Sequence, residues 1–259
     1  YCRDEDHQTH TRRTEILSFE EIVKIVRLFA ELGVTKVRLT GGEPLLRKDI
    51  LDLTKMLGQI PGLADIPLST NAHLLPGKAK ELKEHGINRL NISLDTLDPQ
   101  RHKDITRGGD LETVINGIDK AIEVGMKPIK LNMVVMKGIN EDEIEAMVEF
   151  AIGRSLDIRF IETMPIGLAG IEAVDRHYSE AEILSRIQKR YGNKLIAKAP
   201  KQTDGPAKAL LIEGTNTHVA TISAVSNHFC GTCNRVRLTA KGDLVLCLGQ
   251  EDSVSLRDA

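Results

Sequence analysis

The sequence predicts an α/β fold, an incomplete barrel of parallel strands with helices outside it, followed by an antiparallel region. Two observations predict it. Strand-like and helix-like segments alternate through the first four-fifths of the chain with short connections, the pattern of parallel βα units. From about residue 166, one helix is followed by short strand-like segments with no helices between them. We therefore expect two parts, residues 1–165 and residues 166–259.

The helices are predicted from caps and from apolar periodicity. Ser18 and Glu21 form an S-x-x-E capping box that opens an amphipathic stretch to Leu32, and Gly33 is placed to end it. A second capping box, at residues 179–182, opens a helix to about Tyr191. Helical patterns between these two cover residues 48–57, 76–85, 111–124 and 141–154.

Nine short apolar segments are predicted as strands. Five belong to the first part, residues 37–40, 66–70, 90–94, 129–136 and 158–162, and four to the second, residues 209–212, 218–223, 235–239 and 244–248. Parallel strands gather their ligands at their carboxyl ends. Polar residues stand at four of these ends, at 41–44, at 69–71, at Ser93 and Asp95, and at 162–165. We expect one shared site at the mouth of the barrel.

Composition excludes several classes of protein. The 259 residues are 41% hydrophobic and 28% charged, as in a globular protein with a substantial core. A formal net charge of -2 argues against a nucleic-acid partner. No apolar run approaches the roughly 20 residues that cross a bilayer, and the first residues lack the apolar core of a signal peptide. These observations predict a cytoplasmic location without a membrane partner.

Three of the four cysteines gather near the end of the sequence. Cys230 and Cys233 form a C-x2-C pair, and Cys247 follows after 13 intervening residues, across a predicted hairpin that returns it to the pair. Thiolates bind iron–sulfur clusters and zinc. Three of them leave one iron of a four-iron cluster open, whereas a closed zinc site would need His228 as the fourth ligand. Three reduced structural cysteines are a further alternative that spacing alone leaves open.

Two arginines follow the cysteine pair. Arg235 and Arg237 fall on one face of a predicted strand, with Val236 between them on the other. Paired guanidinium groups beside a metal site suit an anionic ligand such as a triphosphate. An ordinary solvated strand face would carry the same residues, so the pair is informative only together with the cysteines.

Five segments in this order resemble the radical SAM superfamily and, within it, the GTP 3',8-cyclase family of molybdenum cofactor synthesis. The resemblance covers essentially the whole chain and implies a partial TIM-like radical SAM barrel. It rests on Lys36–Pro44 (KVRLTGGEP), Asn91–Asp95 (NISLD), Arg159–Pro165 (RFIETMP), Asp204–Ala207 (DGPA) and Phe229–Arg237 (FCGTCNRVR) with Cys247. The GGEP segment indicates only the superfamily, and the C-x2-C-N-R-x-R segment is the more specific.

The resemblance also accounts for Tyr1 and Cys2. They look like the end of the C-x3-C-x2-C motif whose three cysteines hold the SAM-cleaving [4Fe-4S] cluster. The first barrel strand and two cysteines would then precede Tyr1, and a further tail would follow Ala259. On this interpretation the chain is truncated at both ends, and the truncated chain alone is expected to be inactive.

Family roles carry over residue by residue. The resemblance implies that Tyr1, Gly42, Ser93 and Met164 contact S-adenosyl-L-methionine. It implies that Cys230, Cys233 and Cys247 hold a second [4Fe-4S] cluster whose open iron receives the guanine ring. The GTP contacts it implies are Arg38, Ser69, Lys130, Arg159, Arg235, Val236 and Arg237. At Ala72 the family often has Gly, which tolerates a positive φ more readily.

The implied reaction is the radical conversion of GTP to 3',8-cyclo-7,8-dihydro-GTP, a lyase reaction that opens molybdenum cofactor synthesis. Hydrogen leaves C3' of GTP, and C3' then bonds to C8 of guanine. An electron donor, a downstream cyclic pyranopterin synthase and a second copy in a homodimer are the expected partners. Two alternatives remain: another radical SAM enzyme with an auxiliary cluster, such as a peptide-modifying maturase, and a non-catalytic fragment that binds nucleotide and one cluster.

Overall fold

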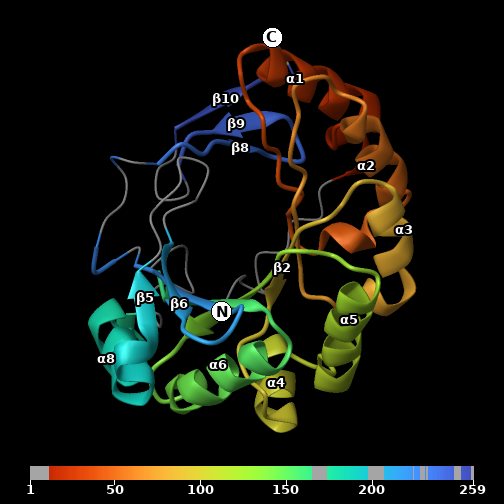
Figure 1. The fold of residues 1–259 in the computed structure, drawn as a ribbon. Coiled ribbons are helices and arrows are strands. Elements are labelled where there is room, and N and C mark those ends of the chain that lie inside the picture. Colours follow the sequence, from red (N-terminus) through yellow and green to blue (C-terminus); the bar gives the residue numbers. More distant parts are fainter. Residues whose placement is uncertain are drawn as a thin grey trace.

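A seven-stranded sheet with helices outside it dominates the fold (Figure 1). The structure is a computed structural model that describes residues 12–164, 174–197, 207–223, 225–227, 231, 233–247 and 252–257. Within these ranges the strand order is β1-β2-β3-β4-β7-β6-β5, and a second sheet has the order β10-β9-β8. The predicted α/β class with an antiparallel C-terminal region is confirmed.

Four parallel strands form the first part of the large sheet. They are β1 (Leu68–Thr70), β2 (Leu90–Ser93), β3 (Ile129–Val135) and β4 (Asp157–Glu162), paired in chain order. The segment predicted as a strand at 37–40 lies beside β1 but makes only two parallel bridges, Lys36 with Asp65 and Leu39 with Leu68. It occupies the expected place without forming a continuous ladder.

The second part continues this same sheet. β7 (His218–Ile222) pairs parallel with β4, and β6 (Lys208–Ile212) and β5 (Leu195–Ala197) then add antiparallel strands. The short sheet contains β8 (Arg237–Leu238), β9 (Asp243–Val245) and β10 (Ser253–Ser255), all antiparallel. Sequence patterns had not indicated β5 and β10, whose three residues are too few to show an alternation. The division at residue 165 stays a prediction.

The helices lie on the outer side of the sheet (Figure 1). Their bounds are α1 (Phe19–Glu31), α2 (Ile50–Gly58), α3 (Ala79–Glu84), α4 (Pro99–Thr106), α5 (Leu111–Glu123), α6 (Ile144–Gly153) and α8 (Glu180–Tyr191). Short 3-10 turns are η1 (Arg13–Glu15), η2 (Pro44–Leu46), η3 (Leu75–Gly77), η4 (Glu141–Glu143) and η5 (Gly192–Lys194). None of the described helices combines the length and apolar character needed to cross a membrane.

Both predicted capping boxes are confirmed. Ser18 Oγ accepts the backbone N–H of Glu21 at 3.2 Å, and the Glu21 carboxylate accepts the N–H of Ser18 at 2.6 Å. Ser179 and Glu182 repeat the arrangement at α8. Sequence analysis missed α4, whose largely polar surface shows little apolar periodicity. Its start is nevertheless signalled by the Asp98 cap and Pro99 at the first helical position.

The turn after β1 packs closely against α5. Ala72 has φ 64° and is fully buried, so the alanine adopts the left-handed conformation that sequence analysis had expected to favour glycine. The carbonyl oxygen of Ala72 faces Gly117 in α5, where an added Cβ would lie only 2.4 Å from it. The turn at the end of β1 therefore depends on the absence of a side chain at position 117.

The space around two helix glycines predicts different effects on stability when each is replaced by alanine. Gly117→Ala should lower the free energy of unfolding by about 1–3 kcal/mol, because the new methyl group overpacks the turn. Gly153→Ala, on α6 where a Cβ meets nothing within 4 Å, should leave it unchanged or raise it by up to about 1 kcal/mol. Urea unfolding of both variants checks this, and equal midpoints would contradict the packing at Gly117.

Candidate functional site

The inner face of the sheet, turned away from the helices, carries the polar residues of the site. Along β3 and β4 the exposed fraction alternates, because the residues that pack on the helices are buried and those between them are half-buried. The inner residues of these two strands include Lys130, Asn132, Asp157 and Arg159. Half-burial of charged and amide side chains means that water reaches this face of the sheet.

Strand register arranges the inner residues in two levels. Ser69, Asn91, Lys130 and Asp157 are matched across β1 to β4 and form the deeper level. Ser93, Asn132 and Arg159 are matched across β2 to β4, two residues nearer the carboxyl ends. Two residues of strand correspond to about 7 Å. The predicted GTP contacts Ser69 and Lys130 therefore lie below the predicted SAM contact Ser93.

Hydrogen bonds and ion pairs connect these levels. Lys130 Nζ lies 3.5 Å from Asp157 Oδ2, and His218 Nδ1 from β7 lies 2.9 Å from the other oxygen of the same carboxylate. Arg159 donates to Asn91 Oδ1 at 3.0 Å. The buried Oδ1 of Asn132 has no hydrogen-bond partner within the described part of the chain. An unsatisfied buried acceptor between Ser93 and Arg159 marks a place for a donor from a ligand, and no sequence motif had singled out Asn132.

Arginines from both parts of the chain interact electrostatically. Arg38 is accessible to water yet surrounded by protein, and this burial, followed by the charges of Arg235 and Arg89, lowers the pKa of Arg38, whereas Asp65 opposes the shift. Burial and then the charge of Arg235 also lower the pKa of Arg237. Of the predicted GTP contacts, Arg235 therefore lies within electrostatic reach of both Arg38 and Arg237. Their mutual repulsion would be relieved by an anion.

The predicted hairpin returns Cys247 toward Cys233. β8 and β9 pair antiparallel with Arg237 opposite Val245, and Cys247 follows two residues after this pair. Hydrogen bonds from Arg235, the backbone one foremost, hold the pKa of the Cys233 thiol below its ordinary value, and the charges of Arg235 and Arg237 act the same way. Neither cysteine forms a disulfide bond within the described part of the chain. Thiols on two neighbouring segments, with the pKa of Cys233 lowered, suit an iron–sulfur cluster or zinc.

Several predicted ligands lie outside the described residues. They are Tyr1, Cys2 and Cys230, together with the alternative zinc ligand His228. Within the ranges that the structure describes, no group of three His, Cys, Asp or Glu side chains is arranged to hold a metal ion. Cys233 and Cys247 are thus the described members of the predicted triple.

The predicted SAM contacts Gly42, Ser93 and Met164 all stand at the carboxyl ends of strands or just after them. Ser93 ends β2, and Met164 follows β4 with 38% of its surface exposed. A Cβ built on Gly42 would meet nothing within 4 Å. The backbone there is open on one side, as a close approach by a ligand requires. Val236 is also exposed, between the half-buried Arg235 and Arg237.

Other polar residues at strand ends hold loops instead of lining the inner face. Glu43 accepts hydrogen bonds from Thr70 Oγ1 at 2.8 Å, the Asn71 N–H at 2.8 Å and the Leu45 N–H at 3.0 Å. Asp95 accepts the N–H of Val134 at 2.8 Å. Ser69 and Ser93 take positions on the inner face, and their place in one shared site stays a prediction, whereas Glu43 and Asp95 hold neighbouring backbone.

Glu162, the last residue of β4, is likewise an anchor. Its alternation with the inner residues places its side chain on the outer side of the sheet, where it is 1% exposed. Oε1 accepts the N–H of Glu180 at 2.7 Å, and Oε2 accepts those of Val225 at 3.0 Å and Ser226 at 2.9 Å. Burial acts to raise the pKa of Glu162, but these hydrogen bonds outweigh it and hold the pKa below its ordinary value.

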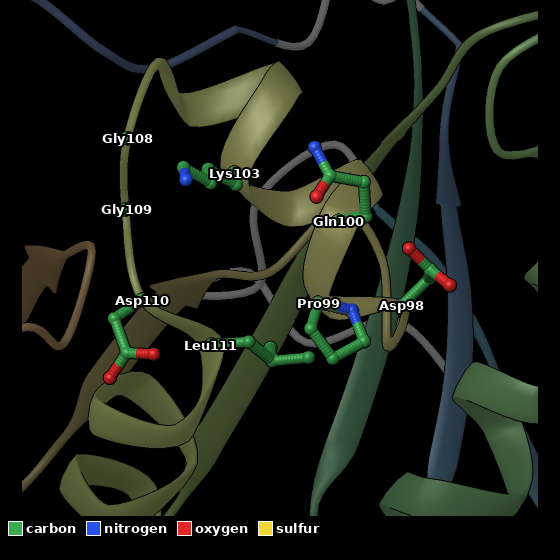
Figure 2. Close-up of a pocket in the computed structure, with 8 residues that line it drawn as sticks. All are labelled: Asp98, Pro99, Gln100, Lys103, Gly108, Gly109, Asp110 and Leu111. Carbon is green, nitrogen blue, oxygen red and sulfur yellow. The ribbon is translucent and has the colours of Figure 1, made fainter.

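A surface depression between α4 and α5 lies apart from this site. It has a volume of about 600 Å³ and is lined by Asp98, Pro99, Gln100, Lys103 and the 108–111 turn (Figure 2). The close-up shows no cluster of convergent polar groups, because Asp98, Lys103 and Asp110 lie well apart around its rim. None of the predicted site residues borders it, so the depression adds nothing to the candidate site.

Comparison with known proteins assigns both parts of the chain. Residues 1–151 match the Radical SAM superfamily, and residues 156–259 match Molybdenum Cofactor Synthesis C. A protein named GTP 3',8-cyclase from Hydrogenovibrio crunogenus is 51% identical over 99% of this chain and 78% of its own length. GTP 3',8-cyclase 1 of Pseudomonas aeruginosa is 46% identical over 99% of this chain and 77% of its own.

Similarity to solved structures supports the fold. Streptococcus suis SuiB bound to S-adenosylmethionine superposes with a TM-score of 0.73 over 97% of this chain and 59% of its own, at 16% identity. Coproporphyrinogen III oxidase (HemN) from Escherichia coli, a radical SAM enzyme, superposes with a TM-score of 0.51 over 79% of this chain and 56% of its own, at 14% identity. At these identities the likeness concerns the fold alone.

The contacts of Glu43 predict a stability effect at the glycine-rich loop. Glu43→Gln should lower the free energy of unfolding by about 1–3 kcal/mol, because an amide NH₂ cannot accept the hydrogen bonds that both carboxylate oxygens receive. Glu31→Gln, at the exposed end of α1, is the matched control and should change it by less than about 0.5 kcal/mol. Chemical denaturation measures both, and equal values would contradict the anchoring role.

Proposed function

Because this chain belongs to the GTP 3',8-cyclase family of the radical SAM superfamily, we propose that it converts GTP to 3',8-cyclo-7,8-dihydro-GTP, the first step of molybdenum cofactor synthesis. The observation that carries the assignment is the convergence of Arg38 on the sheet with Arg235 and Arg237 from the C-terminal region. Guanidinium groups from both matched parts form one anion site beside the thiols of Cys233 and Cys247.

SAM belongs at the upper level of the inner face. Gly42 offers open backbone, Ser93 a hydroxyl group and Met164 an exposed thioether side chain. The unsatisfied Oδ1 of Asn132 adds an acceptor beside Ser93. When bound, SAM and its [4Fe-4S] cluster supply the hydrogen abstraction that no amino-acid side chain performs. Tyr1 and Cys2 are the residues of this chain that we assign to that end of the site.

GTP belongs at the deeper level, with its triphosphate toward the arginines. Arg38, Arg235 and Arg237 neutralise the phosphate charge, and the Val236 backbone lies between two of them. Lys130 and Ser69 face the same space, with Lys130 oriented by Asp157, and Arg159 reaches it from the upper level through its hydrogen bond to Asn91. Fixed cations on rigid strands hold the ribose C3' under the upper level, which is the positional control that the cyclisation needs. The sheet and its helices exclude water from one side.

A second [4Fe-4S] cluster is our proposal for Cys230, Cys233 and Cys247. It is supported by the hairpin that returns Cys247 and by the lowered pKa of Cys233. Its position beside Arg235 and Arg237 would let the guanine ring meet the open iron while the phosphates stay on the arginines. We also propose that the enzyme acts in the cytoplasm as a homodimer, with an electron donor and a downstream cyclic pyranopterin synthase as its partners. The boundary between the two parts of the chain is proposed at residue 165.

The arginine site predicts a graded loss of nucleotide affinity. Arg235→Ala and Arg237→Ala should each weaken GTP binding about 10- to 100-fold, because each removes a charged hydrogen-bond donor to phosphate. Arg190→Ala, which breaks only an exposed contact with Glu149 on the outer helices, should bind GTP as the unchanged chain does. Anaerobic calorimetry with GTP measures all three. Unchanged GTP affinity in both Arg235→Ala and Arg237→Ala would contradict the proposed anion site.

The cysteine triple predicts iron in this chain. After anaerobic reconstitution with iron and sulfide, the chain should show the absorbance of an iron–sulfur cluster. This absorbance should be absent from the Cys230/Cys233/Cys247 triple Ser variant. Cys2→Ser is the control, because it leaves the triple intact. Metal analysis decides between the alternatives, since stoichiometric zinc without iron would establish the zinc site in place of the cluster.

A further inference from the structure

Glu162 stands at the meeting point of three chain segments that the proposed site requires. Its own segment continues into Met164, the predicted SAM contact. Ser226, whose N–H it accepts, lies four residues before Cys230 and nine before Arg235. Through Glu180 it also contacts the first turn of α8. Glu162 thus links the end of β4 directly to the segment that leads into the cysteines.

The carboxylate is built into this position. It is 1% exposed and accepts three backbone N–H groups, with the Ser226 hydroxyl group as an additional donor. One of the three N–H groups begins α8, where the helix dipole favours a negative charge. Charge-assisted hydrogen bonds to buried carboxylates are stronger and shorter than neutral ones. A neutral side chain of the same shape would hold the segment less tightly.

The surroundings secure the anchor from two further sides. His177 Nε2 lies 3.9 Å from Glu162 Oε2, and this ring nitrogen is buried without a hydrogen-bond partner in the described part of the chain. Glu180 is tied back to the sheet, because its carboxylate accepts Thr221 Oγ1 of β7 at 2.6 Å and lies 3.6 Å from Lys208 Nζ of β6. The anchored segment is therefore fixed to rigid elements.

Resting on the function proposed above, we propose that Glu162 is a positioning residue: it holds residues 225–226 against the end of β4 and thereby sets the place of Cys233 and the following arginines relative to the SAM level. It acts on backbone groups from the outer side of the sheet and touches neither GTP nor SAM. Its effect passes through the cysteine-bearing segment, which is otherwise exposed at 225–227.

The test compares Glu162→Gln with Glu149→Gln in the full chain, each reconstituted anaerobically. Glu149 is exposed, is bonded to Tyr191 at 2.9 Å, and controls for loss of a glutamate charge. In Glu162→Gln we expect the amides of Val225 and Ser226 to exchange hydrogen about tenfold faster, and cluster iron to pass to a chelator about tenfold faster. Glu149→Gln should match the unchanged chain in both, and helix content should be equal in all three.

Ser226→Ala provides a second reading that does not disturb the core, because Ser226 is exposed. It removes the hydroxyl donor, so exchange at Val225 should quicken by a smaller factor, and Ser226→Ala in the Glu162→Gln background should add nothing. If Glu162→Gln does not fold, Ser226→Ala tests the positioning role by the same two measurements, the amide exchange rate at 225–226 and the rate of iron release. Unchanged exchange at 225–226 together with unchanged iron release would overturn the positioning role.

The two proposals fail in distinguishable ways. If the unchanged chain takes up no iron at its C-terminal cysteines, the cluster proposal fails, while amide exchange at 225–226 still reports on the anchor. If the unchanged chain holds the cluster and binds GTP but Glu162→Gln behaves identically, the function stands and the anchor is refuted.

Discussion

The parallel pairing of β4 with β7 is the contact on which the proposed site depends. Residues 158–161 pair with residues 219–222, joining segments about sixty positions apart in the chain. β4 carries a carboxylate at each end that accepts backbone N–H groups next to β7: Asp157 accepts from His218 at 3.1 Å, and Glu162 accepts from Val225 and Ser226. Two acids thus fix both ends of one ladder. Without it, the arginines of the C-terminal region would have no defined position opposite Arg38.

This arrangement concentrates like charge, which folding alone would avoid. Burial, and after it the charge of Arg235, lowers the pKa of both Arg38 and Arg237. Asp65 offsets part of the repulsion, but its carboxylate is already shared between Lys36 and Arg89. A site that gathers more cations than acids is stabilised by an anion, so stability and phosphate binding are expected to be linked. The rigid strands beneath supply the framework that keeps the cations together.

The acids around the site divide according to the groups they contact. Asp157 lies on the inner face and orients Lys130, whereas Glu43 and Glu162 accept hydrogen bonds from loop backbone and Asp95 accepts one from the backbone of β3. Such residues look alike in a sequence, since all stand near strand ends. Within β4, side-chain alternation separates two of them, because it sends Asp157 to the inner face and Glu162 to the outer face. Residues that shape loops are therefore as informative about the site as those that line it.

The sequence by itself determined the local structure and the family. Capping boxes at Ser18 and Ser179 predicted two helix starts, and the cysteine spacing with Arg235 and Arg237 predicted a thiol and anion site, because these signals lie within a few residues of one another. The sequence overstated the strand at 37–40, where only a brief ladder forms, and it did not reveal β5, β10 or α4. Short elements show too little periodicity to be recognised.

Only the tertiary structure decided which residues share a level of the inner face. Lys130 stands beside Asp157, Asn132 has an unsatisfied acceptor, and Glu162 turns outward to hold the cysteine-bearing segment. Each of these depends on strand register and on pairing between distant segments. A single sequence carries no record of that pairing, because register is set by how whole elements pack together.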